Sequence, residues 1–273
     1  MFYSCSNLTR FNGDLSSLED GSQMFDNCSK LSSFASDLCS LKNGKRMFYV
    51  CTALTSFTSE LHNLNDGSNM FYDCSNLTTF TSDLPSLTNG YCMFRGCSAL
   101  ESFSVDLPSL TIGERMFYRC IAFTSFNSDL SSLKNGYGMF GYCENLTSFT
   151  SDLSSLTNGK DMFRYCSSLT SFSSDLSSLT DGSHMFYRCS NLTSFTSNLS
   201  SLTDGEGMFS NCELNAESIQ HIADTINDLK SQGETGKIHI DYADDVPSII
   251  LYESGEKLTN KGWTVYFKGV NWE

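Results

Sequence analysis

Cysteine is the residue type in this 273-residue chain whose spacing first points to chemistry. Ten of the twelve cysteines lie 23 residues apart, from Cys5 to Cys212. No histidine or carboxylate pair recurs beside them, so the series lacks the ligand pattern of a metal site. We expect free, buried thiols that pack as small apolar groups. Cys39 and Cys92 stand outside the series, and Cys92 falls at a variable position that we expect to be exposed and reactive.

Catalytic motifs are absent from the sequence. The four histidines are scattered, and no G-x-S-x-G elbow, phosphate-binding loop or H-E-x-x-H motif occurs. Serine is abundant only because it belongs to a repeated unit. We therefore expect a protein that is not an enzyme and carries no cofactor.

An acidic series shares one position of the same repeat. Its members are Asp14, Asp37, Glu60, Asp83, Asp106, Asp129, Asp152 and Asp175. A carboxylate placed before Leu-Ser-Ser can accept hydrogen bonds from the following backbone N–H groups, and we expect this role. Calcium binding along Asp83, Asp106, Asp129, Asp152 and Asp175 is the alternative, although calcium needs six to eight oxygen ligands and neighbouring serines would have to supply some of them.

Tyrosine and arginine gather at four variable positions, the two before and the two after each Met-Phe pair. Because stacked coils lie about 5 Å apart, these side chains should form one continuous patch. The predicted ligand-binding residues are Tyr118, Arg119, Tyr137, Tyr142, Arg164, Tyr165, Tyr187 and Arg188. Both residue types are enriched at binding hot spots, so we expect a protein or acidic glycan as ligand. Alternatively, the tyrosines only cover the core while their hydroxyls reach water.

All of these residues are positioned by a 23-residue unit, MFYRCSNLTSFTSNLSSLTDGEG in the copy from Met185 to Gly207. Nine full copies start at Met1, and a tenth begins at Met208. A fixed period of this length is typical of a solenoid, in which each coil buries its apolar face against its neighbours. We expect a parallel strand over residues 146–151, a tight turn after it, and a positive φ at Gly159.

The pattern Met-Phe-x-x-Cys-x-x-Leu-x-x-Phe, with glycine before the next Met-Phe, resembles the BspA-like (treponemal-type) leucine-rich repeat family. The resemblance covers residues 1–212. It implies a curved, right-handed solenoid with one short parallel strand per coil, a cell-surface or secreted location, and binding to a host or cell-surface protein or glycan. The chain departs from the family at a usually apolar site, which holds Ser36, Ser59, Ser82, Ser128, Ser151, Ser174 and Ser197. These hydroxyls could hydrogen-bond along the stack, and a parallel β-helix is the alternative architecture.

Residues 213–273 no longer follow the repeat. Asn215 can cap a helix over 216–230, and strands are expected over 237–242 and 263–267. The closing Lys-Gly-Trp-Thr-Val-Tyr-Phe resembles the tails of leucine-rich repeat proteins encoded by gut bacteria and their phages. We interpret this small α/β segment as a cap over the open end of the solenoid; a separate binding domain is the alternative.

The net charge of −14 argues against nucleic acid as a partner. No apolar run is long enough to span a membrane. Met1 opens a coil directly, so we expect the C-terminal part of a longer protein whose export signal, if any, lies upstream. Three functions remain: an adhesion module of a surface or secreted bacterial protein, a phage tail or receptor-binding component of a virion, and ice or mineral binding. The last suits the sequence poorly, because Thr-Ser-Phe-Thr spaces its threonines by three instead of two.

Overall fold

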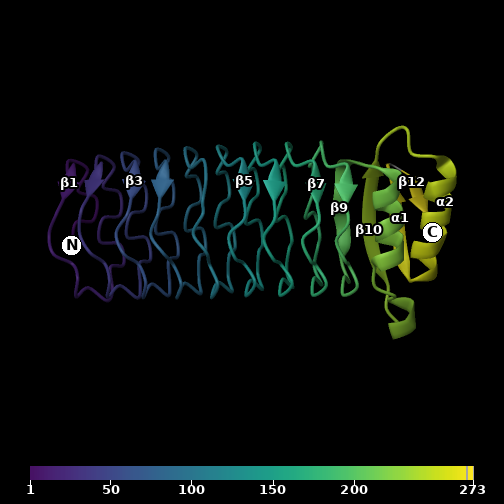
Figure 1. The fold of residues 1–273 in the computed structure, drawn as a ribbon, viewed down its shortest axis with the longest axis horizontal. Helices are drawn as coiled ribbons and strands as arrows, with labels where there is room; N and C mark the ends of the chain where they lie inside the picture. Colours follow the sequence, from purple (N-terminus) through teal and green to yellow (C-terminus); the bar gives the residue numbers. More distant parts are fainter. Residues whose placement is uncertain (269, 273) are drawn as a thin grey trace.

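The computed structural model describes residues 1–268 and 270–272. Its repeats stack as coils in a row, with the N-terminus at one end and the C-terminal segment at the other (Figure 1). Short strands lie on one side of the stack: β1 (Arg10–Phe11), β2 (Ser33–Phe34), β3 (Ser56–Phe57), β4 (Thr79–Phe80), β5 (Ser125–Phe126), β6 (Ser148–Phe149), β7 (Ser171–Phe172) and β8 (Ser194–Phe195). They pair in parallel with a register of one repeat, for example Phe126 with Phe149. The predicted parallel strands are confirmed.

Each strand is shorter than the sequence suggested. Of the expected segment 146–151, only Ser148–Phe149 is a strand. The backbone N–H of Thr147 still donates to Thr124 O (2.9 Å) and that of Thr150 donates to Phe126 O (3.1 Å), so contact between coils continues on both sides. Residues 102–103 of coil five, in contrast, form no strand.

A second ladder of hydrogen bonds, which the sequence did not indicate, runs through the Met-Phe segments. Between coils five and six, the backbone N–H of Gly113 donates to Asn135 O (2.8 Å) and that of Arg115 to Tyr137 O (2.8 Å). Between coils six and seven, the N–H of Phe117 donates to Met139 O (2.9 Å) and that of Arg119 to Gly141 O (2.8 Å). Every second N–H points to the next coil because the residue before Met and the second residue after Phe adopt positive φ, as at Arg115 (51°) and Arg119 (63°). This ladder holds the four variable positions in place.

The glycine before each Met-Phe pair was expected to supply a positive φ, and that expectation is wrong. Gly113 and Gly159 are not among the residues with positive φ. Glycine is needed for space instead, since a Cβ at Gly113 would lie 2.8 Å from Met139 Sδ and 3.0 Å from Leu133 Cδ1. The methionine of the next coil therefore packs directly against this backbone.

The interior consists of columns of Met, Phe, Cys and Leu. Phe117 stacks on Phe140 with ring centroids 5.5 Å apart, and Phe126 meets Phe140 edge-on at 4.7 Å. The thiol of Cys143 donates to Phe117 O at 3.2 Å, and the same bond recurs along the column. Burial raises the pKa of Cys143. The prediction of free, buried cysteines is confirmed from the second coil onward, whereas Cys5 is exposed.

Two smaller expectations about side chains fail. Cys92 is only 1% exposed, because Tyr91 and Arg95 lie beside its thiol. The serine series does not form a continuous hydrogen-bonded column, since the buried hydroxyls of Ser82, Ser151 and Ser197 have no partner among the described residues.

The C-terminal segment contains four strands and two α-helices. They are β9 (Gly205–Leu214), α1 (Ala216–Thr225), β10 (Gly236–Tyr242), α2 (Ser248–Asn260), β11 (Trp263–Phe267) and β12 (Val270–Trp272), with a 3₁₀ turn at Lys230–Gln232. The sheet has the order β12-β11-β10-β9. The sequence predicted α1, β10 and β11 but not β9, α2 or β12, and α1 ends earlier than expected because Ile226 already has extended backbone (ψ 149°).

Helix α1 packs against the last repeats, with Ile219 and Ile222 fully buried in the same core, and Figure 1 shows it beside β10 at the C-terminal end of the stack. Asn215 caps it by accepting from Ser218 N (2.9 Å), as predicted. Ser218 Oγ in turn accepts a hydrogen bond from Phe195 N (2.8 Å). In a longer stack, the strand of the following coil would accept from this N–H instead. On the ladder through the Met-Phe segments, Asn211 N donates to the carboxylate of Asp241 at 2.7 Å. Among the described residues, no helix is long and apolar enough to cross a bilayer.

Candidate functional site: the Tyr/Arg face

The eight predicted binding residues, together with their neighbours on the Met-Phe segments, form what we call the Tyr/Arg face. Ring contacts connect successive coils: Tyr118 and Tyr142 are 5.2 Å apart, Tyr142 and Tyr165 are 4.5 Å apart and stacked, and Tyr165 and Tyr187 are 5.9 Å apart. All four tyrosines are half-buried. The backbone ladder beneath them sets this spacing, so the aromatic rings form a continuous column.

The predicted arginines lie over these rings. Arg119 is 5.5 Å from the centroid of Tyr142, Arg164 is 4.9 Å from that of Tyr187, and Arg188 is 5.3 Å from that of Tyr165. Each contact is within the range of a cation–π interaction. The face is therefore already ordered without a ligand, which lowers the entropy lost on binding.

The column extends beyond the predicted coils. Arg95 lies 4.9 Å from the ring of Tyr118 and 5.4 Å from that of Tyr72. Tyr72 stacks on Tyr49 at 4.7 Å. The Tyr/Arg face thus covers coils three to nine, and the predicted patch is its C-terminal part.

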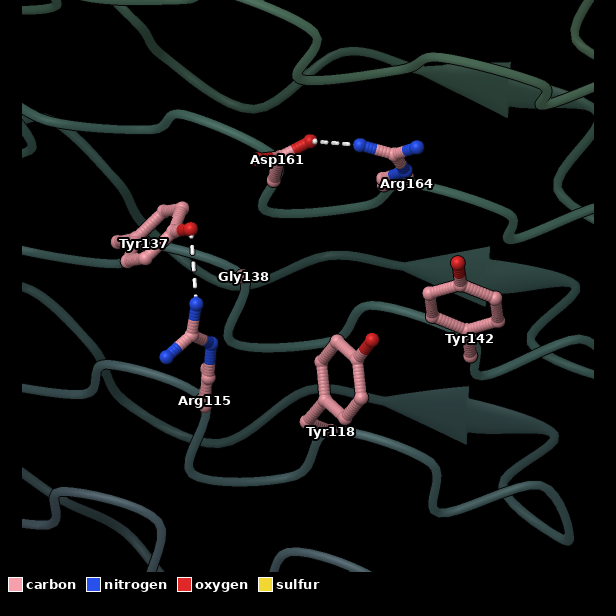
Figure 2. A pocket seen from close by; sticks show the side chains of 7 residues that line it. All are labelled: Arg115, Tyr118, Tyr137, Gly138, Tyr142, Asp161 and Arg164. Atoms are coloured by element: carbon pink, nitrogen blue, oxygen red, sulfur yellow. Dashed lines mark hydrogen bonds and ion pairs between the residues drawn. The ribbon is translucent and has the colours of Figure 1, made fainter.

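A hollow of about 260 Å³ opens in the middle of the face. It is lined by Arg115, Tyr118, Tyr137, Gly138, Tyr142, Asp161 and Arg164. Figure 2 shows Gly138 at the centre, with the six side chains arranged around it. Two contacts hold the rim in place: Arg115 Nη2 donates to the hydroxyl of Tyr137 (2.8 Å), and Arg164 Nη1 donates to Asp161 Oδ1 (3.1 Å).

Gly138 opens the hollow. Gly138 and Gly141 flank Met139-Phe140, at positions where the preceding repeat has Arg115 and Tyr118. A Cβ at Gly138 would lie 3.3 Å from Arg115 Cγ, and one at Gly141 would lie 2.9 Å from the Tyr118 ring. The Tyr118 ring thus covers Gly141, whereas Gly138 leaves a gap in this row between Tyr137 and Tyr142.

Sequence reasoning placed Tyr118, Tyr137, Tyr142 and Arg164 in the site, and the structure brings them together around the hollow. Tyr137 lies on the opposite rim from Tyr142, not in the ring column (Figure 2). Arg115, Gly138 and Asp161 were missed as site residues. The available signal was the sequence Gly-Tyr-Gly-Met-Phe-Gly-Tyr, in which a glycine stands directly before and directly after Met-Phe.

A family model described as a BspA type leucine rich repeat region, six copies, matches residues 1–101 and 88–215. The chain belongs to this family. The leucine-rich repeat architecture expected from the sequence is thereby shown, in preference to the parallel β-helix. No curated protein matches the chain.

Among solved structures, the chain is similar to a leucine-rich repeat protein from Bacteroides ovatus ATCC 8483. The two are 18% identical, the match covers 78% of this chain and 80% of the other, and the TM-score is 0.36.

In these BspA-type coils four of the eight acidic positions cap turns as expected. Asp152 Oδ1 accepts from Ser154 N (2.8 Å), and the same bond occurs at Asp14, Asp129 and Asp175. Hydrogen bonds from the backbone and hydroxyl of Ser131 hold the pKa of Asp129 below its usual value. Asp106 instead accepts from the backbone N–H of Asp129 (3.0 Å), and Asp83 lies 3.8 Å from a histidine nitrogen. No group of three or more His, Cys, Asp or Glu side chains in the described chain is close enough to hold a metal.

Proposed function

We propose that this chain is a non-enzymatic binding module of a surface or secreted bacterial protein. It recognises a protein or glycan on a host or another cell through the Tyr/Arg face. The observation that carries the proposal is the continuous column of tyrosine rings and guanidinium groups along coils three to nine.

Three physical features support this function. Tyrosine and arginine give large contact area together with directional hydrogen bonds, which is why both are frequent at hot spots. Here their side chains are held by ring stacking and cation–π contacts. The rest of the chain is acidic, so a face rich in arginine stands out electrostatically from its surroundings.

The test replaces Tyr142, Tyr165 and Tyr187 together by serine. Serine is accepted by the scaffold, because Ser4 and Ser210 occupy the corresponding positions in other coils. Labelled wild-type and variant chains are applied to a printed glycan array and to immobilised extracellular-matrix proteins. We expect binding to fall at least tenfold, since truncating a hot-spot aromatic residue costs about 2 kcal/mol.

A matched control replaces Tyr3 by serine. Tyr3 is exposed and occupies the repeat position of Tyr187, but it lies in coil one, outside the Tyr/Arg face. We expect it to bind like the wild type, with both variants melting at similar temperatures. Wild-type binding by the triple variant, or the absence of any binding by the wild type, would overturn the proposed function.

A further inference from the structure

We propose that the hollow over Gly138 takes one carboxylate-bearing sugar ring of a glycan. The inference rests on the proposed function, because the hollow lies within the Tyr/Arg face. Four features of the hollow lead to it: its size, its aromatic walls, its mixed hydrogen-bonding groups and its charge.

The size of the hollow suits a single ring. Its volume of about 260 Å³ is just below the roughly 300–1,000 Å³ of pockets that hold drug-sized ligands. Gly138 has no side chain, whereas Arg115 and Asp161 occupy the same repeat position in the coils on either side, so a ring bound over Gly138 would fill the space that a side chain leaves open. Its neighbours would be Tyr118 on one coil and Arg164 on another.

The aromatic walls offer surfaces for the C–H groups of a sugar. The rings of Tyr118 and Tyr142 have centroids 5.2 Å apart and planes inclined by 59°, so they form two sides of a wedge. In Figure 2 the hydroxyls of both rings point upward, toward the side on which Arg164 lies. Each ring thus supplies an apolar face together with a group that both donates and accepts a hydrogen bond.

The polar groups favour a polyhydroxylated ligand over an acidic peptide side chain. A carboxylate only accepts hydrogen bonds, whereas a sugar hydroxyl both donates and accepts. Asp161 and Arg164 present an acceptor and a donor side by side, joined at 3.1 Å. Such a pair matches adjacent sugar hydroxyls, while Asp161 would repel a peptide carboxylate at the same place.

The charge of the lining selects an acidic sugar. Two guanidinium groups and one carboxylate line the hollow, in a chain of net charge −14. Arg164 is paired with Asp161. The guanidinium of Arg115 donates to the Tyr137 hydroxyl through Nη2, and its Nη1 forms an ion pair with Glu114 that is longer (3.7 Å) than the pair of Arg164 and Asp161 (3.1 Å). Arg115 is therefore the group available for a carboxylate on the sugar ring.

The experiment measures the binding of single sugars by ligand-detected NMR. The probes are the methyl glycosides of glucuronic, galacturonic and sialic acids, with methyl glucoside and methyl galactoside as neutral counterparts and glutarate as a carboxylate that is not a sugar. We expect at least one acidic glycoside to bind at least tenfold more tightly than its neutral counterpart and than glutarate. Equal binding of acidic and neutral sugars, stronger binding of glutarate, or no binding of any glycoside would overturn the inference.

Gly138→Asn fills the hollow without demanding a new backbone conformation. Asn69 occupies the same repeat position with φ 56°, close to the 58° of Gly138. We expect this variant to melt like the wild type and to lose acidic-sugar binding at least tenfold. Asn69→Gly, the reverse change on the same face, is the matched control and should leave sugar binding unchanged.

Arg115→Gln tests the selection for charge, and should reduce the preference for the acidic sugar over the neutral one by about tenfold. Unchanged acidic-sugar binding in Gly138→Asn would show that the sugar binds elsewhere. If that variant also keeps the array and matrix binding that the triple tyrosine variant loses, the inference about the hollow fails while the proposed function stands.

Discussion

Replacing Gly113 by alanine tests why every coil has glycine before its Met-Phe pair. A positive φ and a lack of space would both disfavour alanine, but only a lack of space would make the cost depend on the neighbouring side chains. Gly113 does not have a positive φ, and an added methyl group would lie 2.8 Å from Met139 Sδ. The structure therefore predicts a steric cost that a smaller residue at Met139 removes.

The expected magnitude follows from two opposing effects. Overpacking a rigid core typically costs about 1–3 kcal/mol, and both contacting atoms belong to fully buried side chains, Met139 and Leu133. Replacing glycine by alanine also reduces the entropy of the unfolded chain, which stabilises the protein by about 0.4–1 kcal/mol. The net expectation for Gly113→Ala is a loss of about 1–2 kcal/mol in the free energy of unfolding.

The assay is a double-mutant cycle of Gly113→Ala and Met139→Ala, measured by urea denaturation with equal slopes required for all four chains. Met139→Ala alone should cost about 2–5 kcal/mol, because it leaves a cavity. In that background Gly113→Ala should cost nothing or be slightly stabilising. The coupling free energy between the two sites should then be about 1–2 kcal/mol.

Gly233→Ala is the control, since Gly233 has φ 75° and nothing within 4 Å of its added Cβ. It should cost about 1 kcal/mol through the backbone alone and show no coupling to Met139. Additive effects of Gly113→Ala and Met139→Ala would refute the steric explanation and restore the conformational one.

Two further predictions concern the cysteines and the acidic turns. Brief alkylation of the native chain should label Cys5 and Cys39 and leave Cys92 unmodified, as read by mass spectrometry, because Cys92 is covered and its burial raises the pKa of the thiol; rapid labelling of Cys92 would contradict the packing around it. Asp129→Asn should lower the urea midpoint more at pH 7 than at pH 2.5. The pKa of Asp129 is lowered in the folded chain, so its charge stabilises the fold above the pKa of the unfolded state, and that contribution disappears as the pH falls through the folded pKa. An equal effect at both pH values would show that only the hydrogen-bonding geometry matters.

Much of the fold could be predicted because the sequence contains nine copies of one repeat. The positions of Phe149, Cys143 and their equivalents are invariantly apolar, and stacking leaves only one way to bury them all. The Met-Phe ladder could not be predicted, because its alternating backbone conformation is adopted by residues as different as Arg115 and Tyr142 and leaves no mark on composition. In the C-terminal segment, α2 was missed because it buries mainly Ser254, Gly255 and Leu258, which is too weak an apolar stripe to indicate a helix.

The candidate site was predicted in outline for a related reason. Most variable positions of a regular scaffold face outward, so Tyr142 and Arg164 could be placed on one face from their spacing. The hollow could not be found in the same way, because it is created by the absence of a side chain at Gly138. The burial of Cys92 depends on two neighbours, Tyr91 and Arg95, that occur together in only one coil.

The hollow over Gly138 can also be regarded as a vacancy in a one-dimensional lattice. Each lattice site is one coil, and the backbone ladder is the same whether a site is filled or empty. Deleting or inserting one 23-residue coil between Met1 and Met93 would change the distance of the vacancy from the N-terminal end by one coil spacing, about 5 Å, without altering its lining. Exchanging Gly138 and Gly141 with their counterparts in another coil would move the vacancy itself. Repeat duplication and recombination can therefore shift the hollow along this chain in fixed steps of one coil.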